Sequence, residues 1–193
     1  MVVGYSFRDT YTNGNANAAA FIYAPGGNMI DIGTLGGLSA AAEGINDAGQ
    51  IVGVSTLSAA SAPGGSAAQH GFLYADGLMR DLGTLGGNSS IAWGINKAGQ
   101  IVGGAETASG DDDAFLYECG MMIDLNSLLP EASGWQLYEA RAISDSGKIV
   151  GWKGLTGSAH CHEITCPSGN RLLARAARKY LFRAATALFP DRR

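Results

Sequence analysis

The chain has little of what marks several common protein classes. Only 16% of its 193 residues are charged while 46% are apolar, which excludes a disordered acidic tail or a coiled coil. No apolar run reaches the ~18 residues that a membrane helix needs. The first residues, Met1 to Ser6, lack the basic segment and apolar stretch of a signal peptide. We therefore expect a globular chain that carries no membrane span and no export signal of its own.

Cysteine and catalytic motifs are also scarce. Three cysteines, Cys119, Cys161 and Cys166, are too few and too odd in number for a disulfide framework. The chain contains no Gly-x-Ser-x-Gly elbow, no His-Glu-x-x-His helix and no dinucleotide fingerprint, and only three histidines are available as general bases. We expect a protein that is not an enzyme and that needs no cofactor.

Glycine and charge are distributed unevenly. The chain has 29 glycines, about twice the usual ~7%, without the three-residue period of collagen, so we expect many tight turns. Residues 168–193 hold seven of the 13 Lys and Arg residues and one of the 17 acids. The remaining body is acidic, which argues against a nucleic-acid partner because phosphate binding requires clustered cations.

Three motifs recur in a fixed order along the chain, and such repeats organise the fold. An aromatic motif is followed by an Asp-x-Gly-Thr-Leu-Gly-Gly motif and then by a Gly-Ile-Asn-x-Ala-Gly-Gln-Ile-Val-Gly motif, and the third copy of each of the last two motifs is degenerate. The aromatic copies begin at Ala20, Gly71 and Ala114, the aspartate copies at Asp31, Asp81 and Asp124, and the third-motif copies at Gly44, Gly94 and Ala142.

The spacing within each copy predicts four short strands. In the first copy these are the run at Phe21, a segment from Met29 to Ile32, one from Ala42 to Ile45 and one from Gln50 to Ser55. Asn46-Asp47-Ala48-Gly49 is a short-hairpin signal, with glycine supplying a positive φ. The sequence therefore predicts an all-β fold of repeated four-stranded antiparallel units. We expect an incomplete β-propeller-like array, with a β-solenoid as the alternative.

The predicted organisation divides the chain at residue 157. Residues 1–6 form a partial repeat, and full repeats span about 19–55, 70–105 and 113–153, with Phe21, Phe72 and Phe115 in equivalent buried positions. Residues 158–193 form a divergent basic tail that we expect to be helical from residue 170. An incomplete ring leaves exposed strand edges, which favour self-association. Membrane contact is expected only through the basic tail.

The three motifs in this order resemble the HAF repeat family of bacterial extracellular proteins. The resemblance covers roughly residues 1–155, although the name-giving His-Ala-Phe triplet is altered in every copy and only His70 keeps the histidine. It implies an exported or surface-displayed repeat protein, sometimes joined to an autotransporter barrel, and transfers no catalytic residues. We expect an extracellular or cell-surface location on this ground alone.

The recurring polar residues are expected to be structural. Asp31, Asp81 and Asp124 should accept hydrogen bonds from nearby turns, and the paired glycines at 36–37 and 86–87 should be turn glycines, since a phosphate loop would need a Gly-Lys-Ser/Thr ending.

The connections between repeats vary and are therefore candidates for binding. The candidate binding residues are Asp111, Asp112 and Asp113 in the third connection, together with His70. A hard cation such as Ca²⁺ is one possibility for the three aspartates, but they lack the alternating ligand pattern of an EF-hand, so a solvated turn is preferred.

One short tract combines imidazole and thiol groups. His160, Cys161, His162 and Cys166 are weak candidate ligands for Zn²⁺, since no second ligand pair follows at the usual spacing. Incidental side chains are the preferred interpretation.

Three functional hypotheses follow. The first is a non-catalytic extracellular or surface repeat module, adhesive or binding a surface glycan or protein through the inter-repeat connections. The second is a propeller-type polysaccharide hydrolase or lyase with an active site built from scattered loops. The third is a fragment of a longer repeat protein without independent activity.

Overall fold

The computed structural model describes residues 1–7, 18–58, 68–130, 134–155 and 158–165, and for residues 153, 155 and 158–165 it describes the backbone only. The described chain is built from antiparallel strands, which confirms the all-β prediction, and none of its sheets closes on itself. The helix expected from residue 170 lies outside the described residues.

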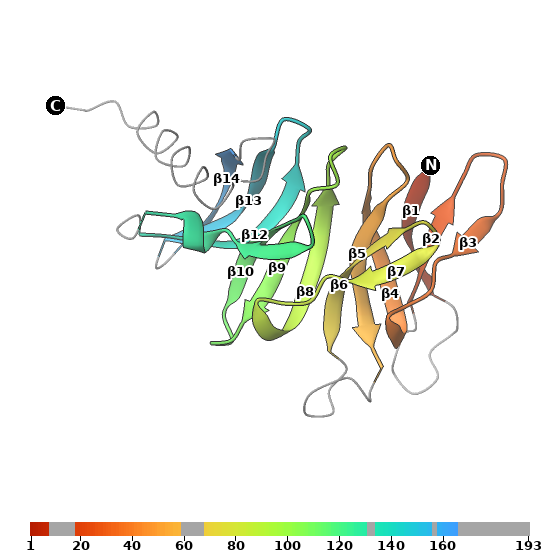
Figure 1. The fold of residues 1–193 in the computed structure, drawn as a ribbon, viewed down its shortest axis with the longest axis horizontal. Coiled ribbons are helices and arrows are strands. Elements are labelled where there is room, and N and C mark those ends of the chain that lie inside the picture. Colours follow the sequence, from red (N-terminus) through yellow and green to blue (C-terminus); the bar gives the residue numbers. More distant parts are fainter. Residues whose placement is uncertain (8–17, 59–67, 131–133, 156–157, 166–193) are drawn as a thin grey trace.

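The groups of paired strands follow one another along the long axis of the molecule in chain order (Figure 1). The first sheet contains β1 (Val2–Phe7), β2 (Ala18–Tyr23) and β3 (Met29–Asp31). The central strands are β4 (Gly36–Ile45), β5 (Ile51–Leu57), β6 (Gln69–Ala75), β7 (Leu78–Asp81), β8 (Gly86–Ile95), β9 (Ile101–Thr107), β10 (Asp112–Glu118) and β11 (Met121–Asp124). The last sheet contains β12 (Trp135–Ile143), β13 (Lys148–Leu155) and β14 (Ser158–Thr165).

Strands pair with their neighbours in the chain. β4 to β7 form one antiparallel meander, β8 to β11 form another, and a single parallel pair between Gln69 and Ser89 joins the two. The register recurs, because a glycine of one strand faces the aromatic position of the next. These pairs are Gly4 with Phe21, Gly53 with Phe72, Gly103 with Phe115, and Gly151 with His162.

The pairing corrects the phase of the predicted repeats. The series predicted as one repeat, 19–55, contributes β2 and β3 to the first sheet but β4 and β5 to the next. A sheet thus combines the third and fourth strands of one motif series with the first two strands of the following series. The hydrogen-bonded unit is therefore shifted by two strands relative to the predicted repeat.

Several predicted boundaries are also corrected. The third strand of the first copy begins at Gly36 rather than Ala42, so Gly36 and Gly37 start a strand of ten residues instead of forming a turn. Gly36 still needs a positive φ, of 97°. The third connection, predicted from Gly104 to Asp113, is shorter in the structure, because residues 104–107 belong to β9 and residues 112–113 to β10.

The boundary at residue 157 does not end the β-structure. Strand β14 pairs antiparallel with β13 over its whole length, from Ser158 opposite Leu155 to Thr165 opposite Lys148. In this register His162 takes the position that Phe72 and Phe115 occupy in the earlier sheets. This strand could not be predicted from the sequence because its aromatic marker is absent.

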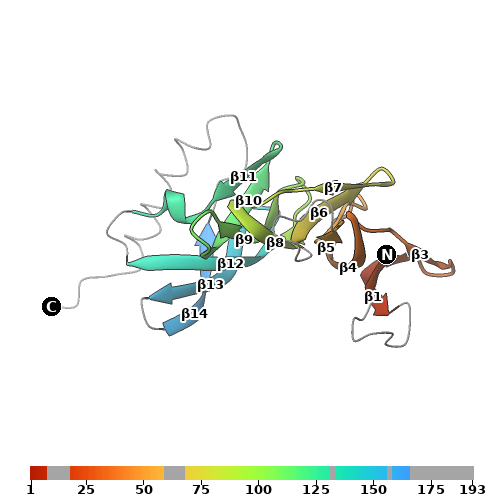
Figure 2. The same cartoon turned by 90° about the horizontal axis from the view of Figure 1, so that it is seen from below.

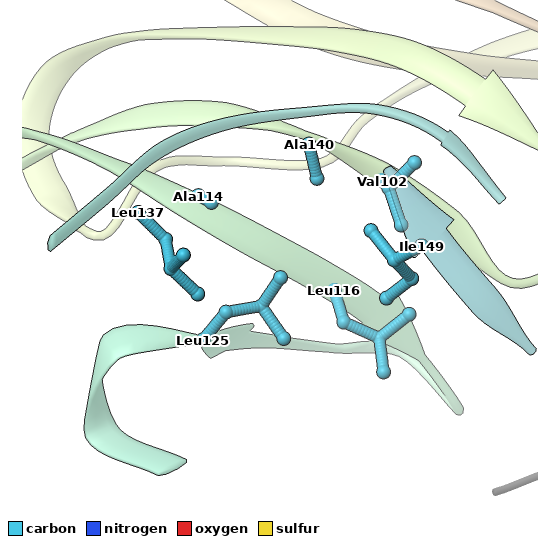
Figure 3. Close-up of a cluster of buried hydrophobic side chains, with 7 residues drawn as sticks. All are labelled: Val102, Ala114, Leu116, Leu125, Leu137, Ala140 and Ile149. Carbon is cyan, nitrogen blue, oxygen red and sulfur yellow. The ribbon is translucent and has the colours of Figure 1, made fainter. Parts of the chain in front are cut away.

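We count the two joined meanders as the second and third sheets. The core then consists of three apolar layers, one between each pair of successive sheets. Ile51 packs toward the preceding sheet and Val52 toward the following one, and both are fully buried, as alternation along a strand requires. Figure 3 shows the last layer, in which Leu116 and Leu125 lie opposite Leu137 and Ile149.

Phenylalanine lies over glycine in each of the first three sheets. A Cβ on Gly53 would lie 2.9 Å from the Phe72 ring and would collide with the Ala41 carbonyl oxygen, which a bulge in β4 brings close. Phe72 and Phe115 are fully buried, as predicted. Phe21 is only half-buried, because no described sheet covers its side of the first sheet.

Candidate functional site

The recurring aspartates shape the turns in which they lie. The Gly33 N–H donates to Asp31 Oδ1 at 2.8 Å, and the Gly83 N–H donates to Asp81 Oδ1 at 2.7 Å. The Asn126 N–H donates to Asp124 Oδ1 at 2.7 Å in the degenerate third copy. These bonds confirm the structural role predicted for the three aspartates.

The asparagine of the third motif ties neighbouring sheets together. Asn46 Oδ1 accepts the backbone N–H groups of Ala48 and Gln50, which shapes the hairpin turn. Its Nδ2 donates to Gln50 Oε1 at 2.7 Å and to the carbonyl oxygen of Asn96 in the next sheet at 3.0 Å. Asn96 repeats these contacts one sheet further on and donates to the Ser144 carbonyl oxygen at 3.1 Å.

The candidate binding residue His70 is engaged within its own sheet. Its Nδ1 lies 2.9 Å from each carboxylate oxygen of Asp81, and the two side chains are 16% and 40% exposed. Because Asp81 also accepts the Gly83 N–H, the pair links β6, β7 and the turn that follows. His70 therefore orients a structural aspartate and presents little surface to a partner.

The position of His70 is taken by Asp113 in the next sheet. Phe115 faces Asp124 as Phe72 faces Asp81, so Asp113 and Asp124 occupy the places of a histidine and its aspartate. Asp113 is 8% exposed and accepts a bond from Gln136 Nε2 at 3.1 Å. Burial raises the pKa of Asp113, and the hydrogen bond from Gln136 opposes this change. The nearby carboxylates of Asp124, Asp111 and Asp112 raise the pKa further.

The three aspartates do not converge. Asp111 lies in the turn between β9 and β10, where Ser109 Oγ donates to its Oδ2 at 2.9 Å and Thr107 accepts and donates backbone bonds. Asp112 is exposed and Asp113 is buried, because successive residues of β10 point to opposite faces. In the part of the chain that the structure describes, no three His, Cys, Asp or Glu side chains form a metal-ligating group.

The candidate zinc ligands fall in and after the last strand. His160, Cys161 and His162 lie in β14, opposite Lys153, Trp152 and Gly151 of β13. Their side chains and the whole of Cys166 lie outside the described residues, as do most of the first two inter-repeat connections, residues 8–17 and 59–67.

The structure brings together a row of side chains that the sequence analysis missed. Glu43, Trp93 and Arg141 precede the same glycine or alanine position in the three copies of the third motif. They lie on β4, β8 and β12, the long strands that contact one another from sheet to sheet. We call these three residues the long-strand row.

Close approach of the long strands makes the row continuous. A Cβ on Gly44 would lie 3.1 Å from the Trp93 carbonyl oxygen, and a Cβ on Gly94 would lie 3.1 Å from the Arg141 carbonyl oxygen. Small residues at these positions let the backbones meet, so the side chains that precede them become neighbours.

The row combines an aromatic ring with charges of both signs. The Arg141 guanidinium carbon lies 3.9 Å above the centre of the Trp93 ring, and Arg141 also forms an ion pair of 2.6 Å with Glu139 on its own strand. Glu43 is exposed on β4, which contacts β8 as β12 does. Among the described side chains, Trp93 Nε1 is a buried donor without a hydrogen-bond partner.

One signal in the sequence marks the row. The motif around it is conserved from copy to copy within the chain, while the residue before Gly44, Gly94 and Ala142 changes from acidic to aromatic to basic. A variable position inside a regular repeat is typical of a binding surface rather than of the frame.

The chain was compared with protein-family models, with curated proteins and with solved structures, and no match was found. Among the described residues, no helix has the length and apolar character required to cross a membrane.

Proposed function

We propose that this protein is a non-catalytic extracellular or surface repeat module that binds a surface glycan or protein. The carrying observation is the long-strand row, in which Arg141 lies over the Trp93 ring and Glu43 occupies the equivalent position on the neighbouring long strand. The recurring polar groups support the same conclusion, because Asp31, Asp81 and Asn96 form hydrogen bonds within the frame. The extracellular or surface location rests on the family resemblance.

The chemistry of the row suits such a partner. Tryptophan and arginine are the residues most enriched where protein interfaces concentrate their binding energy. An indole ring also packs against the apolar face of a sugar, while carboxylate and guanidinium groups bond to hydroxyls. The long-strand row therefore replaces the inter-repeat connections as the proposed binding surface. The binding experiment below distinguishes a glycan partner from a protein partner.

We further propose that the sheets are blades of an incomplete β-propeller-like array. Support comes from the meander order, in which a long strand is followed by β5, β6 and a short outer strand β7, with the next long strand beginning the following sheet. A β-solenoid would join equivalent strands of successive repeats by parallel hydrogen bonding. Here equivalent strands belong to separate sheets that pack across apolar layers instead.

The test is binding of the whole chain to arrays of bacterial surface polysaccharides and surface proteins. We expect Trp93→Ala and Arg141→Ala each to weaken capture about tenfold or more, as loss of a central interface residue does. Arg80→Ala is the matched control, since Arg80 is an exposed arginine on β7, outside the row. Equal capture by all three variants would place binding elsewhere.

A hydrolysis assay on the same polysaccharides separates the alternatives. Turnover without retention would favour the polysaccharide hydrolase or lyase. Neither capture nor turnover would favour a fragment without independent activity.

A further inference from the structure

The arginine of the long-strand row does not offer an open positive charge. Its guanidinium carbon lies 3.9 Å above the centre of the Trp93 ring, and its Nη2 lies 2.6 Å from Glu139 Oε2. The side chains of Arg141 and Glu139 are 42% and 31% exposed, so the ion pair faces solvent. A carboxylate of this chain therefore already occupies the guanidinium donors that an anionic ligand would bind.

Glu139 departs from the motif together with a glycine that lies beneath it. Its counterparts in the earlier copies are Ala41 and Ile91, so the third copy alone has an acidic residue at this place. A Cβ on Gly104 would lie 3.1 Å from Glu139 Cγ, whereas the second sheet has Val54 at the position of Gly104. The absent side chain at position 104 thus leaves room for the Glu139 carboxylate beside the row.

The charge of the surrounding chain also disfavours an anionic partner. Residues 1–167 contain six Lys and Arg residues and 16 acids, a formal charge of −10. Glu43 adds an exposed carboxylate to the row itself. A polymer that carries many negative charges is therefore repelled as it approaches the row.

The groups that the row does offer suit a neutral sugar. The Trp93 ring is partly exposed, and a sugar can pack its apolar face against an indole. Sugar hydroxyls both donate to carboxylates and accept from N–H groups, and among the described side chains Trp93 Nε1 is a donor without a partner. Two glutamates, Glu43 and Glu139, fit poorly at the centre of a protein interface, where this residue type is depleted.

We propose that the long-strand row binds a neutral polysaccharide, and that Glu139 sets this preference by occupying Arg141 against the carboxylates of acidic sugars. The inference rests on the proposed binding function of the row and names its ligand class. Specificity of this kind comes from a group that opposes the wrong ligand. Because solvent-exposed ion pairs are weak, the preference is several-fold rather than absolute.

The experiment measures binding of the whole chain to glucan, mannan and galactan, each beside its carboxymethylated derivative. Within such a pair the sugar chain is the same and only the carboxylates differ. The unaltered chain should bind a neutral polymer about three- to fivefold more tightly than its derivative, which is the range set by an exposed ion pair. Trp93→Ala should weaken capture of the neutral polymer about tenfold or more.

Glu139→Gln tests the origin of the preference. This variant frees Arg141 to pair with a ligand carboxylate, so the preference for the neutral polymer should disappear or reverse. Asp76→Asn is the matched control, because it removes one negative charge in the exposed turn between β6 and β7, outside the row. Circular dichroism and thermal melting establish that each variant is folded.

Salt gives an independent measurement of the same contact. Capture of the neutral polymer by the unaltered chain should change less than about twofold between about 0.05 M and about 0.5 M NaCl, because the ligand carries no charge. Capture of the carboxymethylated polymer by Glu139→Gln should weaken over the same range, because it depends on a new ion pair.

The outcomes separate this inference from the proposed function. Trp93-dependent capture of a carboxymethylated polymer in preference to the neutral one, or of a surface protein alone, would keep the row as a binding surface and overturn the neutral ligand. Glu139→Gln that behaves like Asp76→Asn would overturn the role of Glu139. Capture that persists in Trp93→Ala would place the site outside the row. If the unaltered chain captures no polymer and no protein, the proposed function and this inference both fail.

Discussion

At the residue scale, a single asparagine combines two tasks. Asn96 is 3% exposed, and its Oδ1 accepts the N–H groups of Ala98 and Gln100 within the turn. Its Nδ2 donates to Gln100 Oε1 at 2.6 Å and to Ser144 in the next sheet. The same side chain therefore shapes a hairpin and holds two sheets in register.

Replacing Asn96 by alanine should lower the free energy of unfolding by about 2 kcal/mol or more, because buried backbone N–H groups lose their acceptor. Asn96→Ser should cost less, since Ser144 shapes the equivalent turn through its hydroxyl group. Lys97→Ala, at the exposed neighbouring position, should change stability by less than about 0.5 kcal/mol. Urea unfolding followed by circular dichroism gives the three values, and equal stability of Asn96→Ala and Lys97→Ala would contradict the role of the asparagine.

At the element scale, the strands depend on a glycine beneath an aromatic ring. The bulges in β4 and β8 turn a carbonyl group toward the neighbouring strand, at Ala41 and Ile91. Only a residue without Cβ fits between that carbonyl and the phenylalanine on the other side. The Ile-Val-Gly sequence thus places two apolar side chains on opposite faces of the sheet. Its glycine leaves room for the carbonyl group and the phenylalanine ring.

Gly103→Ala should destabilise the protein by about 3 kcal/mol or more, because the added methyl group would collide with the Ile91 carbonyl oxygen and lie 2.6 Å from the Phe115 ring. Gly104→Ala is the neighbouring control. Its Cβ would meet the flexible Glu139 side chain at 3.1 Å and should cost clearly less. Thermal melting of both variants compares them, and a melting temperature for Gly103→Ala that equals the control would refute the packing argument.

At the scale of the whole molecule, stability comes from layers between sheets, so the position of a residue in the array decides its contribution. Figure 2 shows the sheets following one another from the N-terminal to the C-terminal side of the molecule. Phe72 lies in the apolar layer between the first and second sheets. Phe21 occupies the same register position in the first sheet, on the side that no described sheet covers. Two chemically equivalent residues therefore bury different amounts of apolar surface.

Phe72→Ala should cost about 3–5 kcal/mol, as truncation of a fully buried phenylalanine does. Phe21→Ala should cost about half as much or less, because Phe21 is only half-buried. Chemical unfolding of both variants in dilute solution provides the comparison. Equal losses would mean that the first sheet is covered.

Much of the local structure could be predicted from the sequence because it depends on neighbouring residues. The spacing of short segments within each motif copy indicated strands, and Asp31 accepts a hydrogen bond from a residue two positions away. The resemblance between motif copies also indicated the shared register of Phe72 and Phe115. All of these features repeat with the motif, so one chain displays them several times.

Long-range contacts account for what the sequence could not predict. The phase of the sheets depends on which strands pair, and β14 pairs with β13 although its aromatic marker is missing. The neighbours in the long-strand row come from different copies, as do Asn96 and Ser144. The sequence alone determined the strands and turns, because each motif contains the short apolar segments and the turn residues that form local hydrogen bonds. Tertiary structure decided which motifs share a sheet and which side chains meet between motif copies, because the latter are contacts between residues about 50 positions apart.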